Sequence, residues 1–160
     1  MKNAIFEAHM NTPSFRFSAD YNDIAAIHDA LYSYNLTKTG AERVDVSAAR
    51  FPEQQAMLAC DQSGKAHGGI AFHWLNEPRR IFVDYFFLDE SIRGCGFGRR
   101  IFEEFSVWAK QSGAKEIELT TNTFQAPNFY LKMGFQITHS EPAPVPLLAQ
   151  NIHYSLRKVL

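Results

Sequence analysis

The residues with the clearest potential for chemistry lie in the run IRGCGFGRR, from Ile92 to Arg100. Its alternating glycines let backbone N–H groups turn toward a ligand without intervening side chains. An amphipathic helix predicted directly after it adds unpaired amides and the positive end of its dipole. Arginines in a first helical turn are unfavourable by a few tenths to about 1 kcal/mol, so Arg99 and Arg100 suggest a bound anion. The run therefore predicts a phosphate or pyrophosphate site.

Familiar phosphate-binding loops do not match this run. The chain has no GxxxxGK[ST], and glycines at 94, 96 and 98 give G-x-G-x-G rather than the dinucleotide pattern G-x-G-x-x-G. The strands before the run read as an antiparallel meander and not as a dinucleotide-binding βαβ unit. Taken alone, the run is equally compatible with a tight turn carrying solvated arginines.

Two motifs at compatible spacing narrow the choice. Arg93-Gly94-Cys95-Gly96-Phe97-Gly98, after a strand and before a helix, matches R/Q-x-x-G-x-G/A, and NFYLKMGF matches Y-x-K-x-G-F through Tyr130 and Phe135. In these motifs the chain resembles the GNAT superfamily of acyl-CoA-dependent N-acetyltransferases. The run TFQAPNFYLKMGF is similar to a subgroup with FQAP-FY before the GF element, and HGGIAF falls where a GG pair is common. The match spans roughly residues 55–140.

The resemblance implies where acetyl-CoA binds. It would lie in a gap between the strand DYFFL and the strand containing IELTT, with its pyrophosphate on the amides of Gly94–Arg99. Its pantetheine arm would pair with the edge of Phe86–Leu88, and a backbone N–H near Phe86 or Phe87 would polarise the thioester carbonyl. The cofactor-binding residues so expected are Phe86, Phe87, Leu88, Arg93, Gly94, Cys95, Gly96, Phe97, Gly98, Arg99, Asn122 and Tyr130.

Two residues are candidates for proton transfer, each with a simpler alternative. Tyr130, whose hydroxyl has an ordinary pKa near 10, could hydrogen-bond or protonate the departing thiolate, although a tyrosine in a short amphipathic helix commonly serves packing. Asp84 is the candidate base, and its alternative is a solvated or N–H-bonded strand carboxylate. Asn122 stands eight residues before Tyr130, where the family's usual gap is about seven, so a turn role competes with pantetheine binding.

Hydrophobic spacing predicts an α/β (α+β) architecture around these residues. Alternating apolar positions predict strands at 15–20, 55–61, 66–75, 81–89, 115–121, 135–140 and 152–160. Helical spacing predicts helices at 20–35, 98–112 and 126–133, with a surface loop or partly helical lid at 36–53. Short turns make the first part a meander, and strand 115–121, entered from a helix, is expected to run parallel to its neighbour. The resemblance implies a mixed, mainly antiparallel seven-stranded sheet, splayed centrally and flanked by helices.

Composition limits the classes of protein further. A length of 160 residues predicts a single domain, 1–160, and a net charge of −1 argues against a nucleic-acid partner. No apolar run reaches the ~18–20 residues that span a bilayer, so we expect no membrane association. The six histidines lack metal-ligand spacing, and His73 is read as a packed or surface strand residue. Cys60 and Cys95 lie in unlike contexts, which predicts no disulfide and a cytoplasmic location.

The function expected is transfer of an acetyl group from acetyl-CoA to a primary amine, without a metal. Three alternatives remain: a catalytically weak acyl-CoA-binding or regulatory module, acetylation of a protein or peptide amine, and a nucleotide-binding module that uses the same anion loop. The acceptor would be framed by the first helix, the loop 36–53 and the segment 140–150, which carry no diagnostic motif. The absence of a strongly charged patch favours a small-molecule amine over peptide tails. The stiff segment EPAPVP leaves open an acceptor arm, a dimer contact or a plain connection.

Overall fold

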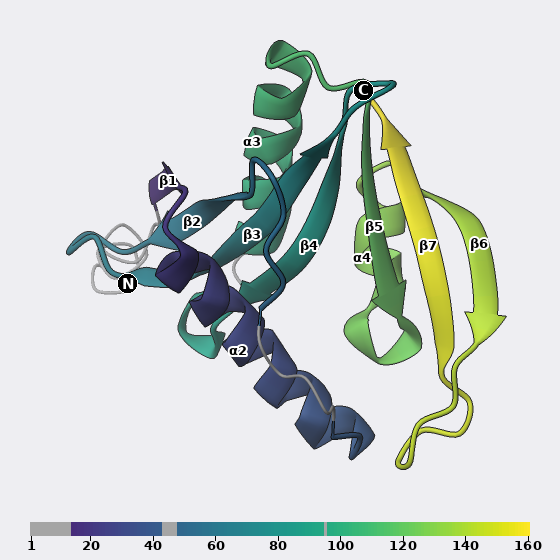
Figure 1. Cartoon of the computed structure of the whole chain (residues 1–160). Helices are drawn as coiled ribbons and strands as arrows, with labels where there is room; N and C mark the ends of the chain where they lie inside the picture. Colours follow the sequence, from purple (N-terminus) through teal and green to yellow (C-terminus); the bar gives the residue numbers. More distant parts are fainter. Residues whose placement is uncertain (1–13, 43–47, 95) are drawn as a thin grey trace, which may run out of the picture.

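The computed structural model describes residues 14–42, 48–94 and 96–160, which form one mixed sheet flanked by helices (Figure 1). The strands are β1 Ser14–Ser18, β2 Gln55–Cys60, β3 Ala66–Leu75, β4 Arg80–Leu88, β5 Glu116–Asn122, β6 Gln136–Pro142 and β7 Ile152–Val159. The helices are α2 Tyr21–Thr39, α3 Phe97–Gln111 and α4 Pro127–Leu131, with short 3₁₀ turns η1 Glu90–Ile92 and η2 Thr123–Gln125.

The sheet confirms the predicted mixed topology. Its strand order is β1-β2-β3-β4-β5-β7-β6, and the only parallel neighbours among these strands are β4 and β5. The crossover between them is α3, as a parallel connection requires. The last strand, β7, lies between β5 and β6 and is therefore not an edge strand of the sheet.

The sheet opens at its centre, between β4 and β5. These two strands pair only through Ile81 with Ile117 and Phe82 with Glu118, and then diverge (Figure 1). On its other side β4 stays paired with β3 as far as Leu88. The backbone of β4 beyond Phe82 therefore presents a free edge toward β5, which confirms the predicted central splay.

A β-bulge in β4 accompanies the divergence. The register with β3 jumps from Val83 opposite Phe72 to Tyr85 opposite Ala71, which leaves Asp84 as the extra residue. Before the bulge Ile81 and Val83 face the main core, and after it the core-facing residues are Phe86 and Leu88. The bulge thus changes which side chains of β4 face the helices, at the level of Asp84.

Hydrophobic clusters cover both faces of the sheet. The larger one lies under α3 and α4 and contains the fully buried side chains of Phe72, Phe102 and Phe105. The smaller one lies under α2, whose Ile24 and Ile27 are 2% and 3% exposed. The apolar stripe predicted for the helix 98–112 is the face of α3 that packs on the sheet.

Helix α2 is longer than predicted. The sequence placed its end at Asn35, with a surface loop or partly helical lid over 36–53, and the helix continues into that segment as far as Thr39 and ends at Gly40, whose φ is 67°. The Thr37 and Thr39 hydroxyls donate to carbonyls four residues earlier, and Leu147 N–H donates to the Thr39 carbonyl at 3.0 Å. The end of the helix is thus fixed by a local glycine cap and by a hydrogen bond from a distant segment. Residues 43–47 of the predicted loop lie outside the described residues.

The glycine pair in β3 marks close backbone contact with both neighbouring strands. A Cβ built at Gly68 would collide with the carbonyl oxygen of Phe87, and one at Gly69 with that of Met57. The register of β2 with β3 also shifts next to this pair. These glycines let β3 fit closely between β2 and the part of β4 that forms the free edge.

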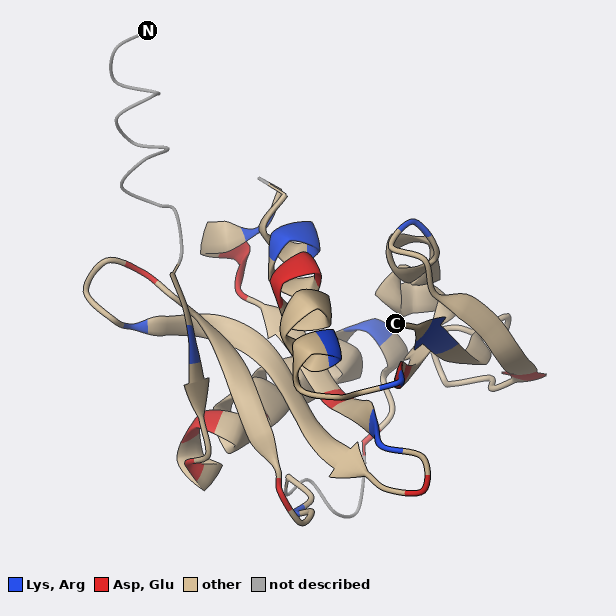
Figure 2. Cartoon of the chain, turned by 90° about the horizontal axis from the view of Figure 1, so that it is seen from above, with Lys and Arg blue, Asp and Glu red and all other residues tan. Residues whose placement is uncertain are grey.

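Charges of both signs are interspersed over the described elements. Figure 2 shows α3 near its centre, with basic residues in the first turn, acidic ones in the next and a lysine near the end. No helix in the described part of the chain is both long and apolar enough to cross a membrane.

Truncation of the core under α3 tests this packing. We expect Phe105→Ala, at a fully buried position, to lower the free energy of unfolding by about 3–5 kcal/mol, because it removes contacts and leaves a cavity. Val107→Ala, on the exposed side of the same helix, should change it by less than about 0.5 kcal/mol. Urea unfolding of both variants checks the difference, and equal losses would contradict the core assignment.

Candidate active site

The predicted anion loop connects β4 to α3 through left-handed glycines. Gly94 and Gly96 have φ of 80° and 78°, and a Cβ at either position would meet open space. Glycine is needed here for backbone conformation. Gly96 is the N-cap of α3, which has no side-chain cap and no acidic residue in its first turn. The first amides of α3 are thus available to an anion. Cys95 lies outside the described residues.

The three arginines around the loop have different surroundings. Arg93 Nε donates to the Leu88 carbonyl, and its guanidinium lies 4.7 Å from the Phe87 ring centroid. Arg99 pairs with Glu103 at 2.8 Å on the exposed side of α3. The Arg100 guanidinium lies over Phe15, away from the loop. Arg93 is therefore the arginine most firmly held beside the anion loop.

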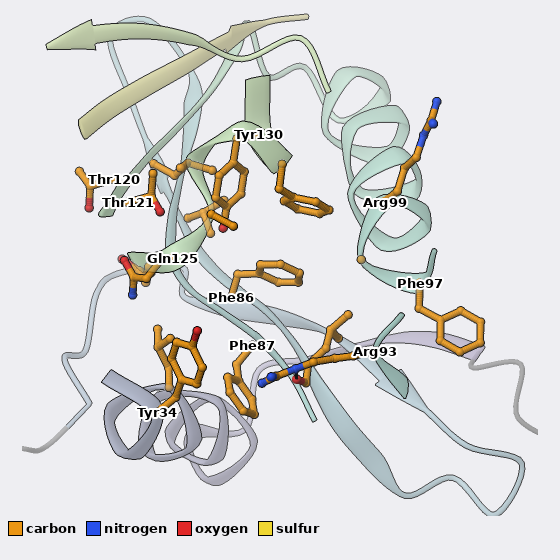
Figure 3. Close-up of a pocket in the computed structure, with 18 of the residues that line it drawn as sticks. Tyr34, Phe86, Phe87, Arg93, Phe97, Arg99, Thr120, Thr121, Gln125 and Tyr130 are labelled. Carbon is orange, nitrogen blue, oxygen red and sulfur yellow. Dashed lines mark hydrogen bonds between the residues drawn. The ribbon is translucent and has the colours of Figure 1, made fainter. Parts of the chain in front are cut away.

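A cavity of about 410 Å³ occupies the gap between β4 and β5. Figure 3 shows the side chains that line it, with Phe97 and Arg99 on one side and Thr120, Thr121 and Gln125 on the other. The structure brings together at this cavity nearly all the residues selected from the sequence. Those that line it are Asp84, Phe86, Phe87, Leu88, Arg93, Gly94, Gly96, Phe97, Gly98, Arg99 and Tyr130.

Sequence reasoning missed other lining residues, which come from α2, β4, β5, η2 and α4. Tyr34 belongs to the apolar stripe of α2, and Gln125 belongs to the FQAP run. Both residues could therefore have been selected from the sequence. Strand alternation gave none for Thr120, because either face of β5 could have been buried. The complete set of missed residues is Leu31, Tyr34, Val83, Leu119, Thr120, Thr121, Gln125, Ala126 and Phe129.

Tyr130 projects from α4 into an aromatic cluster at the cavity wall. Its ring makes edge-to-face contacts with Phe102, Phe129 and Phe135, with centroids 5.2–5.8 Å apart. A Cβ on Gly98 would lie 3.2 Å from Phe129, so this glycine allows α3 to approach α4. Burial raises the pKa of Tyr130 well above its usual range, which keeps the hydroxyl protonated as a hydrogen-bond donor.

Asp84, the extra residue of the bulge, is almost fully buried at the cavity. Its side chain is 4% exposed, and His73 Nδ1 lies 2.9 Å from both carboxylate oxygens. Gln54 Nε2 donates to Oδ2 at 3.3 Å. Burial raises the pKa of Asp84 above 3.8, and the bonds from His73 and Gln54 oppose that rise. Solvation, the simpler alternative for this carboxylate, is therefore wrong, whereas a hydrogen-bonded strand position is correct.

Asn122 is absent from the cavity lining and has a turn role. Its side chain donates to Gln125 Oε1 at 3.0 Å and accepts from Asn151 Nδ2 at 3.1 Å. Gln125 in turn donates to Asn35 Oδ1 on α2 at 2.9 Å, which links the two halves of the sheet across the cleft. Pantetheine binding by Asn122 stays a prediction, and the geometry supports the turn role weighed beside it.

His67 lies outside the cavity and connects β3 to the segment that leads into the anion loop. His67 Nε2 lies 2.7 Å from Asp61, and its Nδ1 lies 3.1 Å from Asp89, the N-cap of η1. The hydrogen bond to Asp61 is the largest cause that raises the pKa of His67 above 6.5. The Ser91 hydroxyl is the main cause that lowers the pKa of Asp89 to about 2.

The family model described as "Acetyltransferase (GNAT) family" matches residues 21–135, which include the whole cavity lining. This chain belongs to the GNAT family of acetyltransferases. It is 30% identical over 115 residues to the blasticidin-S acetyltransferase of Streptomyces morookaense, covering 69% of this chain and 80% of the relative. It is also 29% identical over 129 residues to the peptidyl-lysine N-acetyltransferase YjaB of Escherichia coli, covering 75% and 79%.

Solved structures share the fold. A GCN5-related N-acetyltransferase from Kribbella flavida superposes with a TM-score of 0.70 at 16% identity, covering 93% of this chain and 98% of that one. A protein assigned as a streptothricin acetyltransferase from Bacillus anthracis, in complex with acetyl coenzyme A, gives 0.56 at 22% identity over 76% and 70%. The protein is an N-acetyltransferase, and acetyl-CoA is its co-substrate.

The structure fits this co-substrate at the anion loop and the free β4 edge. In the described ranges, no three His, Cys, Asp or Glu side chains are grouped so that they could hold a metal ion. The predicted assignment to the FQAP-FY subgroup has no independent support, although Gln125, Ala126, Phe129 and Tyr130 of that run all line the cavity.

Arg93 provides a test of the anion site. We expect Arg93→Ala to raise the Kd for acetyl-CoA by about tenfold to a hundredfold, because a hydrogen bond to a charged group contributes roughly 1.5–3 kcal/mol. Arg100→Ala removes an equal charge from outside the cavity lining and should leave the Kd within about twofold. Isothermal titration calorimetry measures both values, and similar losses in the two variants would point to general charge attraction.

The His67 bridge predicts a pH-dependent contribution to stability. The raised pKa of His67 means that its contribution is complete below pH 6.5 and is lost as the pH rises through the raised value. The lowered pKa of Asp89 means that its contribution is complete above pH 3.8 and is lost as the pH falls toward about 2. Urea unfolding should show a larger deficit for His67→Gln at pH 5.5 than at pH 9. An equal deficit at both would contradict the ionic bridge.

Proposed function

We propose that this acetyltransferase acetylates the primary amine of a small molecule, by direct attack on acetyl-CoA in a ternary complex. One observation carries the proposal: a single cavity joins the anion loop, the free edge of β4, Tyr130 and the carboxylate of Asp84. An anion site, an unpaired strand edge, a proton donor and a proton acceptor are the groups that this reaction needs.

The co-substrate would bind along β4. Its pyrophosphate would accept from the amides between Gly94 and Arg99 and from Arg93, near the start of α3. Its pantetheine arm would pair with the backbone of Phe86–Leu88, which is unpaired with β5 and whose Leu88 carbonyl accepts from Arg93 Nε, as an added strand. A backbone N–H of Phe86 or Phe87 would then donate to the thioester oxygen as it becomes negative in the tetrahedral transition state.

The proposed reaction moves one acetyl group and one proton. The amine nitrogen forms a C–N bond with the thioester carbonyl carbon, and the C–S bond breaks with its electron pair on sulfur. Asp84 accepts the proton that nitrogen loses. Tyr130 donates a hydrogen bond to the thiolate, passes its proton to the sulfur and regains a proton from water. The raised pKa of its buried hydroxyl keeps this group protonated before the reaction.

The walls beyond the anion loop favour a small acceptor with few charges. This part of the cavity is lined by aromatic, aliphatic, hydroxyl and amide groups, and Asp84 is the only acidic residue among its described lining. The similarity to a blasticidin-S acetyltransferase supports a small molecule. The similarity to a peptidyl-lysine acetyltransferase is the observation that favours the second candidate, a peptide amine.

Three further parts of the proposal concern the chain as a whole. We place residues 1–160 in one catalytic domain, because strands from both halves build the sheet. We place the chain in the FQAP-FY subgroup on the strength of its cavity-lining run. A cytoplasmic location is consistent with the free, buried thiol of Cys60.

The acceptor class is tested by measuring CoA release with a panel of small amines and lysine peptides at fixed acetyl-CoA. We expect turnover with one or more small uncharged or singly charged amines and little with peptides, because the lining offers one carboxylate. Mass spectrometry of the products confirms N-acetylation. Turnover confined to lysine peptides would establish the second candidate.

Tyr130→Phe tests the proton donor. We expect kcat to fall by about tenfold to a hundredfold while the Kd for acetyl-CoA stays within about threefold, because the change removes only a hydroxyl. Tyr154→Phe removes the same group from a partly buried ring outside the cavity lining and should leave kcat unchanged. Full turnover by Tyr130→Phe across the pH range would remove Tyr130 from this role.

A further inference from the structure

The burial of Asp84 opposes the ionisation that its proposed role as a base requires. A base must be ionised to accept a proton, yet the Asp84 side chain is 4% exposed and lies among aromatic neighbours on β4. Burial of a carboxylate favours its neutral, protonated form. A neutral Asp84 would still occupy the cavity wall but could not accept the proton that the amine loses.

His73 supplies the opposing interaction. Its Nδ1 lies 2.9 Å from Oδ1 and 2.9 Å from Oδ2 of Asp84, a bifurcated geometry in which one N–H serves both oxygens. The Phe51 ring stacks on the His73 ring with centroids 4.1 Å apart and planes 9° apart. The stacked ring holds the imidazole in position, and His73 itself is only 8% exposed. A buried histidine with a fixed ring is a directed donor.

We propose that His73 is a positioning residue of the acceptor site, whose Nδ1–H keeps Asp84 ionised and aimed at the acceptor amine. This inference rests on the proposed role of Asp84 as the base. His73 acts only through Asp84, since it does not line the cavity itself. In the tautomer with its proton on Nδ1, the imidazole donates to the carboxylate, and the remaining carboxylate lone pairs face the cavity.

Other groups around the carboxylate do not serve this purpose. Gln54, from the segment before β2, donates only to Oδ2 and at the longer distance of 3.3 Å. The other titratable or charged side chains that line the cavity are Tyr34 on α2, Arg93 before α3, Arg99 on α3 and Tyr130 on α4. None of these four is among the groups that affect the pKa of Asp84, and His73 is the ionisable one.

The proton balance is simple. As the amine nitrogen forms the C–N bond, its N–H proton moves to a carboxylate oxygen of Asp84, and the electron pair of the N–H bond stays on nitrogen. Asp84 becomes a neutral acid that still accepts the hydrogen bond from His73. After the acetylated product leaves, the acid releases its proton to water and returns to the ionised state.

Two variants of His73 separate the hydrogen bond from packing. His73→Leu fills the site without a donor, whereas His73→Asn retains an N–H₂ donor near the place of Nδ1. In protein labelled with ¹³C at aspartate carboxyl groups, we expect the titration midpoint of Asp84 to rise by about one pH unit or more in His73→Leu. His73→Asn should return it toward the wild-type value. Asp84→Asn identifies the resonance.

Turnover provides a second measurement. We expect His73→Leu to lower kcat by about tenfold to a hundredfold at neutral pH, with the KM for acetyl-CoA within about threefold. His73→Asn should recover most of that loss, and the His73→Leu loss should not exceed that of Asp84→Asn. Phe51→Leu removes the stacked ring but keeps the donor, so it should raise the Asp84 midpoint by less than His73→Leu does.

The outcomes separate this inference from the proposed function. An Asp84 midpoint that is the same in wild type, His73→Leu and His73→Asn would overturn the inference even if amines are acetylated. A defect in His73→Asn as large as that in His73→Leu would also overturn it, because packing alone would then explain the loss. The expected midpoints in a protein that acetylates no tested amine would support the inference while the proposed acceptor fails.

Discussion

The parting of β4 from β5 after two paired residues is the constraint on which the site depends. A strand edge inside a sheet normally satisfies its N–H and C=O groups by pairing with its neighbour. Here the edge of β4 beyond Phe82 faces a cavity instead. A ligand with amide groups along an extended chain can satisfy that edge, which is the chemistry of a pantetheine arm. The sheet therefore forms a binding surface by leaving hydrogen bonds unmade.

The two halves of the sheet are joined by packing and by polar contacts, among them Arg80 on β4 with Glu118 on β5 at 3.1 Å. Aromatic rings of β4, α3 and α4 meet edge to face, including Phe86 with Phe102 at 4.7 Å and Phe102 with Tyr130 at 5.6 Å. Across the cleft, the Gln125 amide of η2 donates to Asn35 on α2. Such aromatic contacts contribute about 0.5–1.5 kcal/mol each beyond area burial. The contacts between the elements that line the cleft thus fix its width.

The bulge at Asp84 connects the fold to the proposed chemistry. An extra residue in β4 shifts the side-chain alternation, so that Phe86 and Leu88 join the core and Asp84 lies at the cavity. His73 is paired with Phe82, two residues before Asp84, and its Nδ1 reaches the Asp84 carboxylate while the Phe51 ring stacks on the imidazole. A carboxylate that burial would neutralise has a directed donor beside it. Asp84 is therefore both the extra residue of the bulge and the carboxylate of the proposed base.

The sequence by itself determined the local features of this protein. Glycines at 94 and 96, the arginine before them and the tyrosine of the GF element have roles set by backbone conformation or by short motifs, which can be read along the chain. The strands, the antiparallel meander, the parallel β5 and the α3 stripe follow from periodicity in the same way. The end of α2 did not follow from the apolar spacing, which stops at Tyr34, whereas the helix runs on to Thr39, whose carbonyl accepts from Leu147.

Only the tertiary structure decided which distant side chains meet. His73 and Asp84 are eleven residues apart on neighbouring strands, and the register that pairs His73 with Phe82 sets their contact. Asn35 and Gln125 are ninety residues apart, so no local pattern could pair them. Asn122 looked available for a ligand until Gln125 and Asn151 were found to occupy its amide. Register and packing are properties of the assembled sheet, and single-strand periodicity does not encode them.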